Sequence, residues 1–593
     1  MNSGERDDDT RITYFAATHT RGKREMFGIR ANDRGKHIYI IGKTGMGKST
    51  MLENMAIQDI QNGEGIAFID PHGSTAERLL DFVPHERIKD VLYFAPFDTD
   101  HPIGFNVMED VGYDKRHLVV SGLMGALKRI WVDAWSARME YILQNTLLAL
   151  LEYPDSTLLD VNRMLTNKTF RAAVVEKITD PIVRTFWVEE FASFTDTYTR
   201  EATPAIQNKV GQFTANPLIR NIIGQSKSSF DLRKMMDEKK IFIVNLSKGR
   251  MGETNAALLG SMLVVKIYLA AMSRADEPAA RLAQLPRFYF YVDEFQSMMN
   301  EAFADILSES RKYKLALTLA NQYIEQMEEK VRDAVFGNVG TLVCFRVGPF
   351  DAEVLKVVFE PTFMAQDLVG LGIGQIYMTL MIDGVGSPPF SAETLPPIDT
   401  PPISYRDDVV RNSRIQFSRG RPEIETLVVK RQTDFAPPPK KEKNPAQGRF
   451  DRRGAPRPPQ DGARPFTNAP RTDTPTQAPG VRIVRPEDQR SALREAIQAA
   501  KSPAFGPTLA SSAPMKSPAD VLRERRAAKE GKAQAAHPSQ QHPVQPQPIT
   551  RAQPQPPPSR PAPAEASEEG GGEITHEELQ KVLNGTWDEA HGN

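Results

Sequence analysis

A glycine-rich octapeptide constrains this chain more than any other feature of its sequence. Residues 42–49 read GKTGMGKS; an apolar run at residues 37–41 precedes them, and a helical pattern over residues 50–62 follows. The octapeptide matches GxxxxGK[S/T] in the strand–loop–helix setting that this pattern requires. In such a loop, glycines let backbone amides close around phosphate groups, and the following helix turns its positive dipole end toward the same anion. The sequence therefore predicts an α/β domain that binds a nucleotide.

The residue types of this phosphate loop (residues 42–49) also predict the cofactors. Lys48 is expected to place its ammonium group at the β- and γ-phosphates, and Ser49 to offer its hydroxyl to magnesium. We therefore expect ATP and Mg²⁺; an accidental glycine-rich turn is the alternative. The residues expected to contact the nucleotide are Gly42, Lys43, Thr44, Gly45, Met46, Gly47, Lys48, Ser49 and Thr50.

A second motif lies far downstream, where the apolar run 288–292 ends in Asp293 and Glu294. In P-loop enzymes a carboxylate at a strand end holds the magnesium shell, and a following glutamate polarises the attacking water. Asp293 is thus a predicted magnesium ligand together with Ser49, and Glu294 a predicted catalytic base. The acidic pair is a weak signal alone, and the phosphate loop strengthens it. It favours ATP hydrolysis over phosphoryl transfer to a metabolite, and the lack of an [N/T]KxD motif argues against a GTPase switch.

Two further residues are candidates for the same site. Gln322 follows the apolar run 315–320, so its amide is expected at the carboxyl end of a strand, where ligands of open α/β sheets bind. There it is a candidate to orient water, or it simply begins a helix. Arg311 closes the helical segment before that run, and a cation at a helix end is often only a complement to the helix dipole. The residues alone therefore leave the role of Arg311 open.

The order of apolar runs predicts the fold class. Helical segments separate most of them, which favours a mainly parallel, doubly wound sheet with helices on both faces. An apolar stretch at residues 256–272 is interrupted by Gly260, Ser261 and Lys266 and is shorter than a membrane span, so we expect a buried helix and no transmembrane segment. The predicted strands are 37–41, 66–69, 91–94, 241–246, 288–292, 315–320, 341–347 and 375–382.

The chain of 593 residues is expected to form more than one unit. Apolar residues at helical spacing fill residues 113–232 with almost no strand signal, which predicts an all-α domain inserted into the sheet domain. The predicted divisions are 1–112 and 233–405 for the sheet domain, 113–232 for the insertion, and 406–593 for a proline-rich disordered tail.

Composition limits the remaining chemistry. A formal net charge of −1 excludes a uniformly basic protein that coats nucleic acid by charge alone. Because Cys344 is the one cysteine and the histidines are dispersed, neither a disulfide framework nor a zinc site is expected. The tail is basic to about residue 564 and acidic beyond it. Near its end a short helix is predicted, with Leu579, Val582, Leu583 and Trp587 on one face as a docking surface for a protein partner.

With these residues in place, the chain resembles the FtsK/HerA superfamily of ring-forming DNA pumps, and within it the type IV secretion coupling ATPases of the TraG/TraD type. The likeness covers about residues 27–382. It rests on the phosphate loop, on the run Asp70-Pro71-His72-Gly73, on Asp293-Glu294-Phe295 and on Ala320-Asn321-Gln322. This ordered set, interrupted by a helical domain, is far more specific than the phosphate loop alone.

The resemblance implies a RecA-like motor domain, an all-α domain facing the cytoplasm, and a hexamer with ATP at the subunit interfaces. It implies that an arginine of one subunit completes the next subunit's site. Arg311 matches that arginine, and Arg346 is the reserve candidate. Asp70 matches the second-strand motif without an assigned role. The sequence departs from the family in one respect: we expect no N-terminal membrane anchor of the kind that is typical of coupling proteins. We therefore expect a cytoplasmic protein that reaches the inner face of the membrane only peripherally.

Three hypotheses follow for the function. The first is an ATP-driven hexameric translocase that couples DNA, or a DNA–protein conjugate, to a type IV secretion or conjugation-like system, with channel or relaxosome-like proteins as partners of the tail. The second is a soluble motor of the same superfamily for DNA processing or segregation. The third is a nucleotide-gated cargo adaptor that does not hydrolyse ATP. Glu294 argues against the adaptor, because an adaptor has no use for a carboxylate that polarises water.

Overall fold

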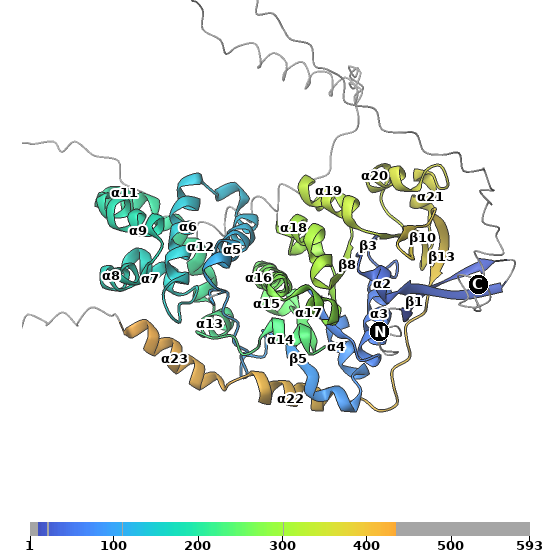
Figure 1. Ribbon diagram of the computed structural model, residues 1–593, viewed down its shortest axis with the longest axis horizontal. Coiled ribbons are helices and arrows are strands. Elements are labelled where there is room, and N and C mark those ends of the chain that lie inside the picture. Colours follow the sequence, from blue (N-terminus) through green and yellow to red (C-terminus); the bar gives the residue numbers. More distant parts are fainter. Residues whose placement is uncertain (1–9, 21–22, 110, 300–301, 435–593) are drawn as a thin grey trace, which may run out of the picture. The chain divides into compact units, whose positions relative to one another are not determined.

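The computed structural model describes residues 10–434, apart from residues 21–22, 110 and 300–301. Figure 1 shows one large sheet flanked by helices and a second region built from helices alone. The predictions made for the tail beyond residue 434, including the terminal docking helix, lie outside the described residues.

An eleven-stranded sheet forms the centre of the sheet domain, in the order β2-β1-β13-β10-β9-β3-β8-β7-β4-β6-β5. The seven strands from β9 to β5 run parallel, and β10, β13, β1 and β2 extend the sheet with antiparallel pairs. The strands are β1 Ile12–Thr20, β2 Lys23–Arg30, β3 Ile38–Ile41, β4 Gly65–Asp70, β5 Val91–Phe94, β6 Ile241–Asn245, β7 Phe288–Val292, β8 Leu315–Asn321, β9 Thr341–Cys344, β10 Gln375–Thr379 and β13 Phe390–Thr394; β11 Met381–Ile382 and β12 Val385–Gly386 form a separate pair.

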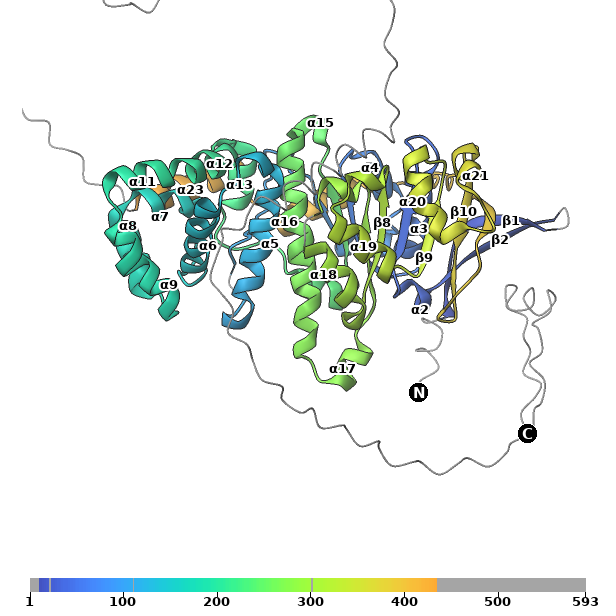
Figure 2. The same cartoon turned by 90° about the horizontal axis from the view of Figure 1, so that it is seen from above.

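The parallel strands are buried on both faces, which explains their continuous apolar sequences. In β3, Tyr39 and Ile41 pack into one core cluster, and Ile38 and Ile40 into the cluster on the opposite face. Helices therefore cover both sides, and the predicted doubly wound α/β class is confirmed. The two views in Figures 1 and 2 show helices on either side of the sheet.

The sequence prediction missed the antiparallel strands β1, β2 and β13. The residues of β2 alternate between buried and half-buried only in its second half, so no continuous apolar run marks it. These strands lie at or near one edge of the sheet, where only part of each side-chain set is buried. A period-2 pattern over so few residues is a weak signal.

Helices of the sheet domain follow the strands they connect. The predicted helix after the phosphate loop is α3 Lys48–Gln61. The others are α2 Ala31–Arg34, α4 Ser74–Leu79, α15 Lys248–Met251, α16 Glu253–Met272, α17 Ala279–Gln284, α18 Ala302–Glu309, α19 Glu329–Asn338, α20 Pro349–Phe359 and α21 Ala365–Gly370.

Residues 113–237 hold helices and no strand of the described sheet. Several of these helices begin at a side chain that accepts a hydrogen bond from the first turn, as Ser136, Asn167, Asp180 and Asp231 do. The helices are α5 Arg116–Ile130, α6 Ala137–Leu151, α7 Asp160–Thr166, α8 Lys168–Lys177, α9 Pro181–Thr185, α10 Phe191–Ser193, α11 Asp196–Ala202, α12 Pro204–Ala215, α13 Pro217–Ile223 and α14 Leu232–Asp237.

The longest helix, α16, was expected to be buried. Within the described part of the chain it alone is long and apolar enough to cross a membrane, and 78% of its apolar window is buried inside the protein. It packs against α5 of the helical region and α14. Its apolar surface is therefore covered by protein, as in the core helix of a globular domain.

One predicted boundary is wrong. Residues 406–433, assigned to the disordered tail, form α22 Arg406–Phe417 and α23 Arg421–Thr433. Val409 of α22 is buried in the core cluster that covers one face of the sheet, whereas Ile424 and Val428 of α23 pack with Leu159 of the helical region. These helices are polar overall, so their fold depends on a few buried contacts that composition does not reveal.

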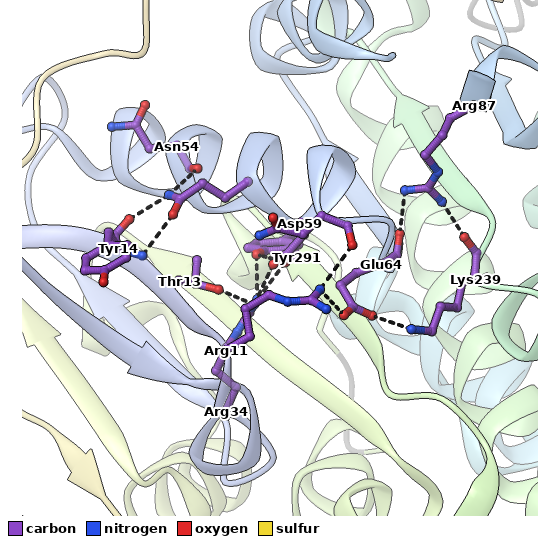
Figure 3. A network of polar contacts seen from close by, with 12 residues as sticks. Arg11, Thr13, Tyr14, Arg34, Asn54, Asp59, Glu64, Arg87, Lys239 and Tyr291 are labelled. Atoms are coloured by element: carbon purple, nitrogen blue, oxygen red, sulfur yellow. Dashed lines mark hydrogen bonds and ion pairs between the residues drawn. The ribbon is translucent and has the colours of Figure 1, made fainter. Parts of the chain in front are cut away.

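A buried ion-pair network links α3 to β7, as Figure 3 shows. The guanidinium of Arg34 donates two hydrogen bonds to the carboxylate of Asp59, at 2.7 and 2.8 Å, and one to the hydroxyl of Tyr291 at 2.6 Å. Tyr291 donates to Asp59, and Arg34 lies 3.7 Å from the ring centroid of Tyr289. The network ties the helix that begins at Lys48 to the strand that ends before Asp293.

Candidate nucleotide site

The phosphate loop turns sharply between β3 and α3, and its glycines permit the turn. Gly45 and Gly47 have φ of 77° and 115°, which side-chain-bearing residues disfavour. A Cβ atom on Gly42 would lie 2.5 Å from the Cβ of Phe345. The loop therefore requires glycine at these positions, of which the sequence pattern predicts Gly42 and Gly47.

Lys48 begins α3 and points back over the loop. Its ammonium donates to the carbonyl oxygens of Gly42 at 2.6 Å and Lys43 at 3.1 Å. The side chain is buried, and this burial lowers its pKa, although the charges of Asp293 and Glu294 oppose the shift. The cation is thus held inside the curve of the loop, where phosphate groups are expected.

Ser49 and Asp293 meet at the carboxyl ends of the strands. The Ser49 hydroxyl donates to Asp293 Oδ2 at 3.0 Å. Burial, followed by the nearby charge of Asp70, raises the pKa of Asp293, and the hydrogen bond from Ser49 acts against this rise. A serine hydroxyl and a buried carboxylate are the hard oxygen ligands that magnesium prefers, so this pair fits Mg²⁺.

Glu294 has a crowded carboxylate. Its Oε1 accepts hydrogen bonds from His72 at 2.8 Å and from Gln322 at 2.5 Å, and its Oε2 lies 3.1 Å from the ammonium of Lys248. Burial favours the protonated form, but the hydrogen bonds from His72 and Lys248 outweigh it and hold the pKa of Glu294 below its usual value. Glu294 is therefore an ionised carboxylate with three donors.

The predicted site residues divide into two groups. Lys48, Ser49, Asp293, Glu294 and Gln322 come together at the carboxyl edge of the sheet. Arg311 does not join them. It is exposed in the turn before β8, at the amino edge, because β8 runs parallel to β3 and the phosphate loop follows the end of β3.

The two remaining candidates, Arg346 and Asp70, each hold the backbone of a turn at this edge of the sheet. The carbonyl of Arg346 accepts the amide of Lys43 at 2.8 Å, which places the backbone of Arg346 beside the phosphate loop. Asp70 accepts the amides of His72 and Ala76, at 2.8 and 2.9 Å, and so shapes the turn after β4. The second-strand aspartate, which had no assigned role, is thus a structural residue of that turn.

Sequence reasoning missed three residues of the site: His72, Lys248 and Arg129. His72 belongs to the run Asp70-Pro71-His72-Gly73, yet nothing in the neighbouring sequence indicates that its side chain contacts Glu294. Lys248 lies 46 residues before Glu294, and only the pairing of β6 with β4 and of β4 with β7 brings them together. Arg129 of α5 donates to the carbonyls of Gln296 and Met299, just after Glu294.

A cavity of about 850 Å³ opens beside these groups. It extends from Thr44 of the phosphate loop to Glu294 and Gln322, and the side chains of His72 and Lys248 also line it. Within the described residues, no group of three or more His, Cys, Asp or Glu side chains is arranged to hold a metal ion.

A family comparison identifies this arrangement. The model of the type IV secretion-system coupling protein DNA-binding domain matches residues 27–353. The chain belongs to this family. The match spans the phosphate loop, the helical region, Glu294 and Gln322, and the resemblance inferred from the motifs is therefore confirmed. Helices α22 and α23 lie beyond the end of the match.

Solved structures with a similar arrangement share little sequence with this coupling-protein family member. The conjugative coupling protein TrwBdeltaN70 in its unbound form is 15% identical, with 66% of this chain and 89% of that chain covered and a TM-score of 0.47. TrwB in complex with ADP and Mg²⁺ is also 15% identical; the match covers 66% of this chain and 97% of that chain, with a TM-score of 0.47. VirB4 of Thermoanaerobacter pseudethanolicus is 12% identical; the match covers 68% of this chain and 99% of that chain, with a TM-score of 0.43. No curated protein matches the chain.

Proposed function

We propose that this chain hydrolyses ATP, with magnesium, to move DNA or a DNA–protein conjugate toward a type IV secretion or conjugation-like system. The observation that carries the proposal is the convergence of Lys48, Ser49, Asp293, Glu294 and Gln322 at the carboxyl edge of the sheet, where Glu294 and Gln322 also line the cavity. These groups supply a cation for phosphates, oxygen ligands for magnesium, and a base with a neighbouring amide.

Each side chain has a distinct task in the proposed hydrolysis of ATP to ADP and phosphate. Lys48 balances the charge of the β- and γ-phosphates, and the backbone amides of the loop bind their oxygen atoms. Ser49 and Asp293 would hold Mg²⁺, which supplies a positive charge to the phosphates. Glu294 accepts a proton from the attacking water, and the amide of Gln322 orients that water.

Arg311 is proposed to act on the site of a neighbouring subunit. Its position at the amino edge of the sheet, opposite the phosphate loop, supports action in trans over action within its own subunit. A head-to-tail ring, proposed as a hexamer, would place the amino edge of one subunit beside the nucleotide of the next. Arg346, whose backbone already contacts the phosphate loop, is then the weaker candidate.

We propose that Arg129 couples the helical region to the nucleotide site, so that a movement of Glu294 is transmitted to α5. This residue of α5 donates to the carbonyls of Gln296 and Met299, on the segment that directly follows Glu294. A shift of Glu294 therefore changes the backbone that Arg129 contacts. Force on DNA and its partners would be transmitted along this connection at the inner face of the membrane.

DNA-stimulated ATPase activity tests the proposal. The purified chain is expected to hydrolyse ATP, faster with DNA than without it, and Lys48→Ala is expected to lose both nucleotide affinity and turnover. Glu294→Gln should keep nucleotide binding while turnover falls by about 10²–10⁴-fold, the usual contribution of a general base. Arg411→Met, an exposed change on α22, serves as the control with unchanged turnover. ATP binding without turnover would contradict the motor and favour the cargo adaptor.

A further inference from the structure

Three groups occupy the carboxylate of Glu294 and limit its use as a base. Both oxygen atoms accept hydrogen bonds, and one of the donors is the ammonium of Lys248. The backbone of Glu294 is in the left-handed region, with φ 45° and ψ 46°. A carboxylate that accepts from three donors has few lone pairs left for a water molecule.

The backbones of His72 and Lys248 are fixed, whereas their side chains are accessible. The amide of His72 donates to Asp70 Oδ1 at 2.8 Å, and the amide of Lys248 donates to the carbonyl of Pro71 at 2.8 Å. Their side chains are 45% and 38% exposed. Each can therefore exchange one acceptor for another by a rotamer change, without movement of the strands that carry them.

The cavity offers these donors a second acceptor. Lys248 and His72 line the same cavity as Thr44 of the phosphate loop. In the proposed complex the loop and Lys48 fix the phosphate chain, so its terminal group projects into this cavity. A terminal phosphate carries more charge than a carboxylate and has three acceptor oxygens, and it therefore competes well for an ammonium and an imidazole N–H.

We propose that Lys248 and His72 bind the terminal phosphate of the nucleotide and thereby release Glu294. The inference rests on the proposed function, because it assigns two more residues to the same site. With a triphosphate bound, Glu294 loses two of its donors and is free to accept a proton from water. With a diphosphate bound, the terminal group is absent and Glu294 returns to Lys248 and His72. The base is thus available only while there is a phosphate to hydrolyse.

Calorimetric binding of AMP-PNP and ADP to the full chain, with Mg²⁺, tests this exchange without turnover. Lys248→Met should weaken AMP-PNP binding by about tenfold or more, as expected for a lost hydrogen bond to a charged group, and leave ADP binding unchanged. Lys248→Arg should retain most of the preference for AMP-PNP. The matched control is Lys240→Met: Lys240 lies at the opposite end of β6, is 28% exposed and pairs with Asp90 at 2.7 Å. The Lys240→Met variant should bind AMP-PNP and ADP as tightly as the wild type does.

Competition between Glu294 and the phosphate gives a second readout. Glu294→Gln removes the charge that competes for Lys248, so it should bind AMP-PNP several-fold more tightly than the wild type, with no change for ADP. In Lys248→Met/Glu294→Gln this gain should shrink, because only His72 is then left to exchange Glu294 for the phosphate. Equal effects on AMP-PNP and ADP, or a gain of undiminished size without Lys248, would overturn the inference while the proposed function stands. Failure of the wild type to bind either nucleotide would instead overturn the proposed function.

Discussion

The network of Arg34 provides a test of how the fold supports the site. Arg34 and Asp59 have side chains that are 1% and 2% exposed, and Arg34→Met would leave the Asp59 carboxylate buried with Tyr291 as its one remaining side-chain donor in Figure 3. Removal of one partner of a buried ion pair costs about 3–5 kcal/mol, because the other charge remains without compensation. We expect a loss of this size in the free energy that holds α3 against β7.

Hydrogen exchange measured by mass spectrometry on the full chain gives this free energy locally. Peptides that cover β7 and the second half of α3 should open more easily in Arg34→Met by the stated amount. Arg411→Met is the matched control, because Arg411 pairs with Asp408 on the exposed face of α22 and should cost less than about 1 kcal/mol.

A compensating variant separates the buried charge from lost packing. Arg34→Met/Asp59→Leu/Tyr291→Phe removes both charges and the hydroxyl that would otherwise lack an acceptor, and it should recover most of the lost stability. If Arg34→Met exchanges like Arg411→Met, or if the triple variant is no more stable than the single one, the reasoning from the uncompensated charge is refuted.

Three further predictions concern the ring, the pH dependence and the tail. A mixture of Arg311→Ala and Lys48→Ala should recover part of the ATPase activity that each variant lacks, because some interfaces then combine an intact arginine with an intact phosphate loop; no recovery in mixed samples would contradict action in trans. His37 is buried, and burial, aided by the charge of Arg311, lowers its pKa from 6.5 to about 4. Its neutral form is therefore required by the fold, and about 3 kcal/mol of stability should be lost as the pH falls from 6.5 to 4, at about 1.4 kcal/mol per pH unit. Asparagine tolerates the φ of 64° and can accept the amide of Leu317, so in His37→Asn the urea-unfolding midpoint should change less with pH between 6.5 and 4 than in the wild type. An unchanged pH dependence of the midpoint would exclude His37 as the cause of the stability loss. Deletion of residues 571–593 should leave ATPase activity intact and remove binding to a purified channel or relaxosome protein, with Trp587→Ala giving most of the effect; a deletion that lowers ATPase activity would count against a docking role.

The sequence by itself determined the phosphate loop, the acidic strand end and the parallel strands. Each of these depends on neighbours in the chain: the turn needs Gly45 and Gly47, and a strand buried on both faces, such as β3, must be apolar at every position. The helical insertion was also visible, because its helices bury apolar residues at regular three- and four-residue spacing.

Only the tertiary structure decided which residues surround Glu294. His72, Lys248 and Gln322 come from the ends of three different strand–loop junctions, and the order of strands in the sheet places them around one carboxylate. That order depends on the packing of whole helices and strands, and no local pattern encodes it. For the same reason the polar helices α22 and α23 were assigned to the tail: a few long-range contacts, such as that of Ile424 with Leu159, fold them, and these contacts exist only once the rest of the chain is in place.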